Sequence, residues 1–288
     1  MRELKGQYDS SFVTRYSSFL KYALLMLFAV FFLFPMYWLV LTSLKTQADQ
    51  FSMPPVWWTK RLTLDYYRAI IFDSSFETLA FNSALACGGS ALLSLVAGTM
   101  GAYSLSRFRL PFRLNHHLSL WILSTRMFPP IVSIVPLFLI MRALDLLDTR
   151  LALVLAYSVF NLPFVVWMMK GFFDELPREL EESALMDGDT HLGAFLRIVL
   201  PLVAPGIAAT AIFCMIVSWN EFLFALILTQ TDSALTLPVG IANQVTQYEI
   251  RWGVMSAAGV VAMTPMFIFA LMVQRYLVRG LSFGAVKG

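Results

Sequence analysis

Residues 171–201 read GFFDELPRELEESALMDGDTHLGAFLRIVLP and lie between two segments that are almost wholly apolar. The stretch carries seven carboxylates, which are Asp174, Glu175, Glu179, Glu181, Glu182, Asp187 and Asp189. A charged side chain at the middle of a bilayer costs about 2.5–3.5 kcal/mol or more. This stretch is therefore expected to lie in water beside a membrane, while its apolar neighbours cross the membrane.

Helix signals in this stretch predict two short helices separated by a glycine. Asp174 and Glu175 precede Pro177, and acidic residues with a proline are typical of a helix start. The first helix is expected to run to about Asp187, and Gly188 can adopt the positive φ that ends it. The pattern therefore indicates a helix, a sharp turn and a second helix.

The predicted apolar surfaces of these two helices differ in width. In the first helix they form a narrow stripe of Leu176, Leu180 and Ala184. Asp189 or Thr190 can cap the second helix. Its apolar positions lead back to the membrane and are Leu192, Phe195, Leu196, Val199 and Leu200.

The small side chains of Ser183 and Ala184, beside Gly188, would let another protein approach this surface closely. The alternative interpretation is a solvated loop between two membrane helices, because charged runs are usually wet faces. Both interpretations keep residues 171–201 in water.

Composition bounds the class of protein. The chain has 288 residues, of which 58% are hydrophobic and 14% charged, so it is far too apolar for a soluble globule of this length. The net charge is only +3, and its basic residues flank apolar segments, so no nucleic-acid partner is expected. Cys87 and Cys214 lie inside apolar segments and are expected to be buried thiols. The sequence carries no metal-ligand cluster, nucleophile motif or phosphate-binding loop.

The predicted fold class is an all-α polytopic membrane protein with six transmembrane helices. The expected spans are 22–41, 78–103, 118–141, 151–169, 206–229 and 253–273. Residues 1–21 form a basic N-terminal tail before a retained first span, and residues 274–288 form a basic C-terminal tail. The third span contains Pro129, Pro130 and Pro136, so its hydrogen-bond ladder is expected to break or kink. The second span is rich in glycine and alanine, which predicts a closely packed core helix.

The distribution of Lys and Arg predicts the orientation. The two tails, the turn after the second span and the stretch after the fourth span together hold 13 of these residues, against 7 in the three opposite segments. Positive residues favour the cytoplasmic side. Both termini and residues 171–201 are therefore expected in the cytoplasm.

Glu221 is the one acidic residue placed within a predicted span, and such a group usually faces the bundle interior or water. Three roles are open. Glu221 could line a sugar route together with Trp219 and Asn220, it could pair with Arg126, or it could carry a proton. For Arg126, which lies near the end of its span, snorkelling to the interface is a further possibility.

The residue pattern of the water-exposed stretch resembles a known signature. Glu182, Ser183 and Ala184 are followed at fixed gaps by Gly188, Ile198, Leu200 and Pro201, as in the EAA signature of permease subunits of bacterial ATP-binding-cassette importers. Ser183 replaces the first alanine, and Asp189 stands where an alanine is common. The sequences WNEF at 219–222 and GLS…AVKG at 280–288 are similar to the MalG-like carbohydrate-uptake branch.

This resemblance implies a type I importer permease fold in which residues 171–201 form the cytoplasmic coupling helix. It implies that the ATPase is contacted by Glu182, Ser183, Ala184, Asp187, Gly188, Ile198, Leu200 and Pro201. The chain would not be an enzyme, because ATP and Mg would be bound by a partner ATPase dimer. Further implied partners are a second permease subunit of different sequence, an extracytoplasmic solute-binding protein and membrane lipid.

The resemblance also implies a function and a place in the cell. The chain would form half of the pore of an ATP-driven importer for a sugar or sugar derivative, in the inner membrane of a bacterium. The candidate residues along the substrate path are Arg126, Trp219, Asn220 and Glu221. The outer loop after the fifth span would touch the binding protein, and residues 280–288 would lie between the ATPase subunits. The alternative is a proton-coupled secondary transporter that uses Glu221.

Overall fold

A computed structural model describes residues 3–72, 74–108, 110–246 and 249–282, and for residues 3–18, 74, 113 and 272–282 it describes the backbone alone. Within these ranges the chain is helical and forms no strand, only the isolated bridges Lys45–Leu62 and Val245–Ile250. The all-α fold class is therefore confirmed. The predicted signature at 280–288 lies largely outside the described residues, and the side chains of the predicted basic tail are not described.

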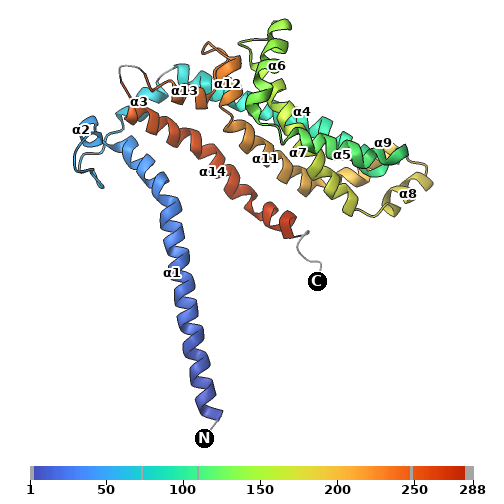
Figure 1. Ribbon diagram of the computed structural model, residues 1–288, viewed down its shortest axis with the longest axis horizontal. Coiled ribbons are helices and arrows are strands. Elements are labelled where there is room, and N and C mark those ends of the chain that lie inside the picture. Colours follow the sequence, from blue (N-terminus) through green and yellow to red (C-terminus); the bar gives the residue numbers. More distant parts are fainter. Residues whose placement is uncertain (1–2, 73, 109, 247–248, 283–288) are drawn as a thin grey trace. The chain divides into compact units, whose positions relative to one another are not determined.

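The chain divides into two compact units. The first comprises Met1–Ile70 and Gln244–Val261, and the second Ile71–Asn243 and Ala262–Gly288. The first unit contains α1 (Glu3–Leu44), α2 (Gln47–Gln50), most of α3 (Asp65–Ile71) and the start of α14 (Trp252–Ser282) (Figure 1). No break in α1 separates the predicted tail 1–21 from the predicted span 22–41, because the helix is continuous from Glu3.

The second unit holds the remaining helices. In chain order they are α4 (Ser74–Arg107), η1 (Pro111–Arg113), α5 (Leu114–Thr125), α6 (Pro130–Ala143), α7 (Arg150–Glu175), α8 (Glu179–Met186), α9 (His191–Ala194), the π-helical turn η2 (Phe195–Val199), α10 (Leu200–Leu202), α11 (Ala204–Trp219), α12 (Leu223–Leu228) and α13 (Leu237–Ala242). The longest packing runs between α4 and α7, with α11 against both (Figure 1).

Small residues let α4 and α7 approach closely. A Cβ added at Gly89 would lie 2.9 Å from Val154 Cγ2, and one added at Gly98 would lie 2.7 Å from Val165 Cγ1. Close backbone approach through small residues is the usual way in which helices pack in lipid. The predicted role of the second span as a core helix therefore agrees with the packing of α4.

Four described helices are long and apolar enough to cross a membrane, and two bent helix pairs raise the number to six if each pair counts as one span. The four are Phe19–Leu44, Ser75–Arg107, Arg150–Glu175 and Trp252–Leu271. The α5–α6 pair bends by 92°, and its break at residues 126–129 lies where prolines were expected to interrupt the third span. The other pair, His191–Leu202 with Ala204–Trp219, bends by 74°.

The predicted fifth span, 206–229, is not one continuous helix. Helix α11 ends at Trp219, and α12 starts at Leu223. The break coincides with Asn220 and Glu221, whose side chains bind backbone groups at the facing helix ends. Polar side chains that satisfy free helix ends make such an interruption possible.

Candidate functional site

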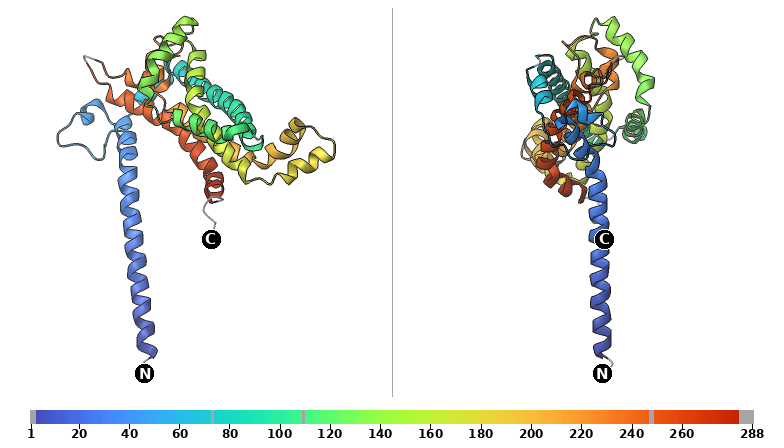
Figure 2. Two further views of the ribbon diagram at one scale, coloured as in Figure 1. Left: turned by 45° about the vertical axis from the view of Figure 1, so that its right-hand side comes forward. Right: turned by 90° about the vertical axis from the view of Figure 1, so that its left-hand side faces the viewer.

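The polar stretch folds as an elbow, defined here as residues 176–203, at one end of the second unit (Figure 2). Helix α7 continues past the predicted end of the fourth span to Glu175, so residues 171–175 are helical rather than loop. The chain then passes Pro177 and forms α8, which starts at Glu179. The predicted order of helix, turn and helix is present, with the first start two residues beyond Pro177.

The turn at Gly188 is a Schellman motif. Gly188 has a φ of 90°. Its N–H donates to Leu185 O over 3.1 Å, and the Asp189 N–H donates to Ala184 O over 3.0 Å. These bonds satisfy carbonyl groups at the end of α8 that would otherwise lack partners. The expected positive φ at this glycine is therefore confirmed.

Thr190 caps the second arm. Its Oγ1 accepts a hydrogen bond from Gly193 N over 3.0 Å. Asp189, the other predicted cap, instead accepts from Thr190 N over 2.9 Å and pairs with Arg197 over 3.5 Å. The second arm then passes from α9 into η2 and α10 before bending into α11 at Val203.

Of the two small residues expected on the surface of the elbow, only one is exposed. Ala184 is buried, with 7% of its surface exposed, whereas Ser183 and Glu182 are exposed. Within the predicted apolar stripe, Leu180 is 42% exposed. The inward face of α8 is instead formed by Glu181 and Ala184, three residues apart on one side of the helix.

The other predicted coupling residues are distributed along both arms. Asp187, Gly188 and Pro201 are exposed, while Ile198 and Leu200 are half-buried. Large apolar side chains are exposed beside them. These are Leu180, Met186, Leu192 and Leu196, and Met186 is 88% exposed. Because this segment is too charged to enter lipid, these exposed apolar side chains are candidates for contact with another protein.

The second predicted site, at the break between α11 and α12, is held by its own chain. Trp219 Nε1 donates to Ala262 O over 3.0 Å, and Asn220 Nδ2 donates to Ile216 O over 2.8 Å. Glu221 Oε1 accepts from Phe224 N over 3.0 Å and its Oε2 from Ala225 N over 3.3 Å. The Glu221 carboxylate thus satisfies free N–H groups at the start of α12, which is a structural use of this charge.

Arg126 lies at the break between α5 and α6 and does not pair with Glu221. Its Nη1 donates to Phe160 O over 3.2 Å, and its guanidinium lies 5.1 Å from the centre of the Phe164 ring. Phe164 stacks in turn on Phe213, with 4.1 Å between ring centres. Arg126 is exposed, so carbonyl and aromatic groups orient its guanidinium without covering it.

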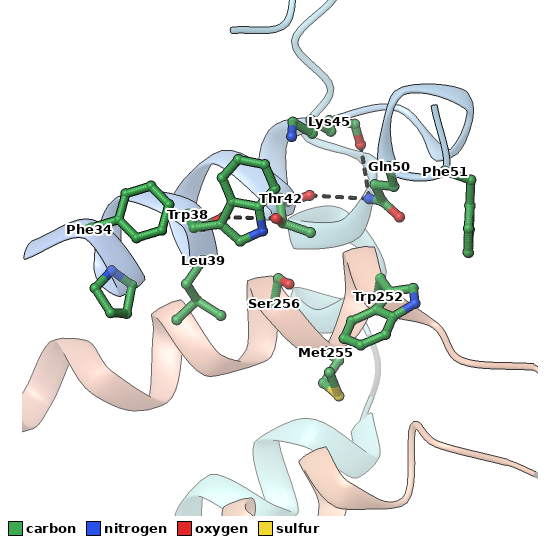
Figure 3. A pocket seen from close by; sticks show the side chains of 11 residues that line it. Phe34, Trp38, Leu39, Thr42, Lys45, Gln50, Phe51, Trp252, Met255 and Ser256 are labelled. Carbon is green, nitrogen blue, oxygen red and sulfur yellow. Dashed lines mark hydrogen bonds between the residues drawn. The ribbon is translucent and has the colours of Figure 1, made fainter. Parts of the chain in front are cut away.

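A groove of about 640 Å³ lies in the first unit between α1 and the start of α14 (Figure 3). Its walls are mainly apolar, with Trp38 and Trp252 among them, and Lys45 and Gln50 line its polar end. The Lys45 Nζ lies 4.1 Å from the centre of the Trp38 ring. Burial lowers the pKa of Lys45, although Asp49 opposes this shift. None of the predicted site residues lines this groove.

Sequence reasoning missed the contacts beneath the elbow. Tyr103 and Phe173 are buried there, and the Tyr103 ring centre lies 4.6 Å from that of Phe195 in η2. Glu181 is also buried at this place. The run of seven carboxylates gave no signal for which of them turns inward. A hint exists only in the helical spacing of Glu181 and Ala184.

Residues 92–283 match the family model described as "Binding-protein-dependent transport system inner membrane component". The chain is 39% identical over 256 residues to the sulfoquinovosyl glycerol transport system permease protein SmoH of Agrobacterium fabrum, covering 89% of each chain. It is 34% identical over 265 residues to the trehalose/maltose transport system permease protein MalG of Thermococcus litoralis, covering 91% of this chain and 94% of that protein.

The fold also has a counterpart among solved structures. A chain of a bacterial ABC transporter involved in the import of the acidic polysaccharide alginate superposes with a TM-score of 0.77. The match covers 91% of this chain and 96% of that chain, at 24% sequence identity. At this identity the match shows the fold, which is that of an importer permease.

Proposed function

This chain belongs to the family of binding-protein-dependent transport system inner membrane components, and we propose that it forms one half of the pore of an ATP-driven importer for a sugar or sugar derivative. The sugar class is supported by the substrates named for SmoH and MalG, which are a sulfoquinovosyl glycerol and the disaccharides trehalose and maltose. The neighbouring genes, including one for the binding protein, would narrow the choice of solute further.

The observation that carries this proposal is the exposed face of the elbow. Ser183 and Glu182 lie on it, and Met186 projects beside them. A helix and turn held rigidly by capped ends transmit a push better than a flexible loop does. The elbow would dock on an ATPase subunit, and closure of the ATPase dimer would move it and reorient the spans.

ATP chemistry would belong to the partner. The sequence has no phosphate-binding loop, and the described residues contain no group of three side chains that could hold a metal ion. ATP and Mg would be bound by the ATPase dimer, and this chain would contribute the moving pore. Its role as a transport subunit is supported by the family match to an inner membrane transport component.

The solute route would pass the two helix breaks. Irregular backbone at membrane depth is tolerated only where it is buried in protein or lines a water-filled cavity. Arg126 and Asn220 are exposed at such breaks and could offer hydrogen bonds to sugar hydroxyls. Trp219 and Glu221 would support the route from behind, because both bind backbone groups of their own chain.

The remaining partners follow from the architecture of such importers. A second permease subunit would complete the pore, and an extracytoplasmic binding protein would deliver the solute. This assembly is supported by a solved bacterial alginate ABC transporter in complex with its periplasmic protein, because one chain of that structure superposes on this chain with a TM-score of 0.67. Both termini would be cytoplasmic, as the distribution of Lys and Arg predicts. The exposed apolar side chains of α1 would face lipid or the second permease.

The test is a substitution on the exposed face of the elbow. Ser183→Arg places a long charged side chain where the ATPase would approach, so the variant is expected to lose co-purification with the ATPase subunit. Ala143→Arg is the matched control, because Ala143 is also an exposed small residue of a helix but lies on the predicted outer side. Normal recovery of the ATPase with Ser183→Arg would contradict the proposed docking.

A further inference from the structure

One carboxylate of the elbow turns inward. Glu181 is 8% exposed, whereas Glu179 and Glu182 on the same helix are exposed. A carboxylate withdrawn from water is costly unless a charge and hydrogen bonds compensate for the lost hydration. The groups that surround Glu181 therefore determine how α8 is held.

The described partners of Glu181 lie in the last turns of α4. Tyr103 donates its hydroxyl to Glu181 Oε2 over 2.8 Å. Arg107 Nε donates to Glu181 Oε1 and forms an ion pair with it, and the two side chains are 8% and 10% exposed. The same guanidinium donates from Nη2 to Leu176 O over 3.1 Å. Arg107 thus joins the end of α4 both to α8 and to the chain that leads into α8.

A second set of contacts crosses the same gap. Ser106 Oγ donates to Asp174 Oδ1 over 2.6 Å, and Arg178 Nη2 donates to Ser106 O over 2.8 Å. Lys170 lies 2.5 Å from Asp174 Oδ2 and holds that carboxylate in place. The end of α4 is therefore fastened to the end of α7 as well as to the elbow.

Tyr103 also contacts the other arm of the elbow. Its ring centre lies 4.6 Å from that of Phe195 in η2 and 5.6 Å from that of Phe173 in α7. Both arms of the elbow therefore meet on a single side chain of α4. Movement of either arm relative to α4 would break buried aromatic or ionic contacts.

We propose that Tyr103, Arg107 and Glu181 form a latch that makes α8 and the end of α4 move as one body. This inference rests on the proposed docking of an ATPase on the elbow. The latch residues are positioning residues, because they face the interior of the chain and do not lie on the docking face. A displacement of α8 is then transmitted to the packed helices α4 and α7. Without the latch, α8 would move relative to α4 and leave α4 and α7 in place.

The experiment measures a distance across the latch. Nitroxide labels are placed at Ser104→Cys on α4 and Glu179→Cys at the start of α8, two exposed positions outside the residues named for the docking face, in a chain whose buried Cys87 and Cys214 are replaced by serine. Pulsed electron paramagnetic resonance is recorded on the complex with its ATPase, without nucleotide and with ATP plus vanadate. The wild-type latch is expected to give one narrow distance distribution that is the same in both states.

Two variants open the latch to different extents. Glu181→Gln removes the ion pair, and Tyr103→Phe removes only one hydrogen bond while keeping the ring contacts with Phe173 and Phe195. Both are expected to broaden the distribution and shift it on addition of ATP plus vanadate, with Tyr103→Phe the milder of the two. Glu175→Gln is the control, because this exposed carboxylate at the end of α7 should leave the distribution narrow.

The outcomes separate this inference from the docking proposal. A label-to-label distance in the wild-type chain that changes with nucleotide would overturn the latch. Distance distributions in both variants that are as narrow as that of the wild type would also overturn it. Failure of the unlabelled wild-type chain to retain the ATPase would instead overturn the docking itself. If Glu181→Gln does not assemble, Tyr103→Phe alone decides, because its change is confined to one hydroxyl.

Discussion

Gly188 ends α8 with a backbone conformation that other residues adopt only under strain. With its φ of 90° it lies in the left-handed region, and an added Cβ would meet no heavy atom within 4 Å. The constraint is therefore conformational rather than a matter of space. For an L-residue the left-handed conformation costs about 1–2 kcal/mol.

Gly188→Ala is accordingly expected to weaken the turn. A loss of about 1–2 kcal/mol of local stability raises the population of opened turn roughly 5- to 30-fold. Hydrogen exchange of the Asp189 amide, which donates to Ala184 O, should accelerate to match. Gly171→Ala is the control, since Gly171 lies in α7 with open space around it. Unchanged exchange at Asp189 would show that the turn does not depend on its glycine.

Asp148 fastens the loop before α7 to the segment after α12. Its Oδ1 accepts from Gln230 N over 2.8 Å and from Thr231 N over 3.0 Å, and its Oδ2 accepts from Thr231 Oγ1 over 2.6 Å. Partial burial acts to raise the pKa of Asp148, but these hydrogen bonds outweigh it, so the pKa lies below its usual value.

A depressed carboxyl pKa predicts a definite pH dependence. The stabilisation from Asp148 is fully present above the unfolded value of about 3.9 and is lost as pH falls through the lower folded value. The purified wild-type protein should lose more thermal stability between pH 7 and pH 3 than Asp148→Asn does. Parallel loss in both proteins would mean that this carboxylate has no part in acid sensitivity.

Single residues show where sequence reasoning succeeds and where it stops. Gly188 and Thr190 could be placed because their roles depend on neighbours along the chain. Glu181 could not, because its main partner Arg107 lies 74 positions away and the neighbouring glutamates look alike. The same limit applies to Ala184, whose burial depends on what packs against α8.

At the scale of elements, glycine positions decide how closely α4 and α7 pack. An added Cβ at Gly98 would lie 2.7 Å from Val165 Cγ1 and 2.8 Å from Val165 Cβ, and Val165 is buried and branched. A Cβ at Gly88 would meet nothing within 4 Å. These two glycines of one helix therefore form a matched pair.

Gly98→Ala is expected to lower the thermal midpoint of the purified protein, because overpacking a close contact costs about 1–3 kcal/mol. Gly88→Ala should leave the midpoint unchanged or raise it, since alanine favours a helix over glycine by about 1 kcal/mol. Thermal unfolding in one detergent compares the two. Equal midpoints would refute the close approach of α4 and α7 at Gly98.

The helix breaks show what hydrophobic length can and cannot predict. Prolines mark the break between α5 and α6, so that interruption could be anticipated. The break between α11 and α12 was not anticipated, because the apolar residues on the two sides of Asn220 and Glu221 together reach the length of one span. There the capping by Glu221 supplies hydrogen bonds that a span-length argument does not consider.

At the scale of the whole molecule, membership in a family of inner membrane transport components accounts for the apolar spans and for a polar elbow outside the membrane. Composition and charge pattern predict a polytopic membrane protein with a polar cytoplasmic segment, and the resemblance of that segment to the EAA signature indicates the ATPase as partner. The orientation of the elbow's side chains required the structure. Within one short helix, Met186 is 88% exposed and Glu181 only 8%.

The proton-coupled alternative gains nothing from this arrangement. The carboxylate oxygens of Glu221 accept backbone hydrogen bonds of α12, and the chain belongs to the family of binding-protein-dependent transport system components. Transport would accordingly depend on ATP hydrolysis by a partner. Collapse of the proton gradient at constant ATP should leave uptake by the assembled complex intact.

Maleimide labelling of a cysteine at position 186 tests the docking of the elbow most directly. The side chain at position 186 is 88% exposed in the free chain. In the permease alone, the cysteine of Met186→Cys should therefore react readily with maleimide, and bound ATPase should protect it. Met53→Cys, at a site 91% exposed in the predicted outer loop, should react equally in both preparations. Equal labelling of position 186 with and without bound ATPase would contradict the account.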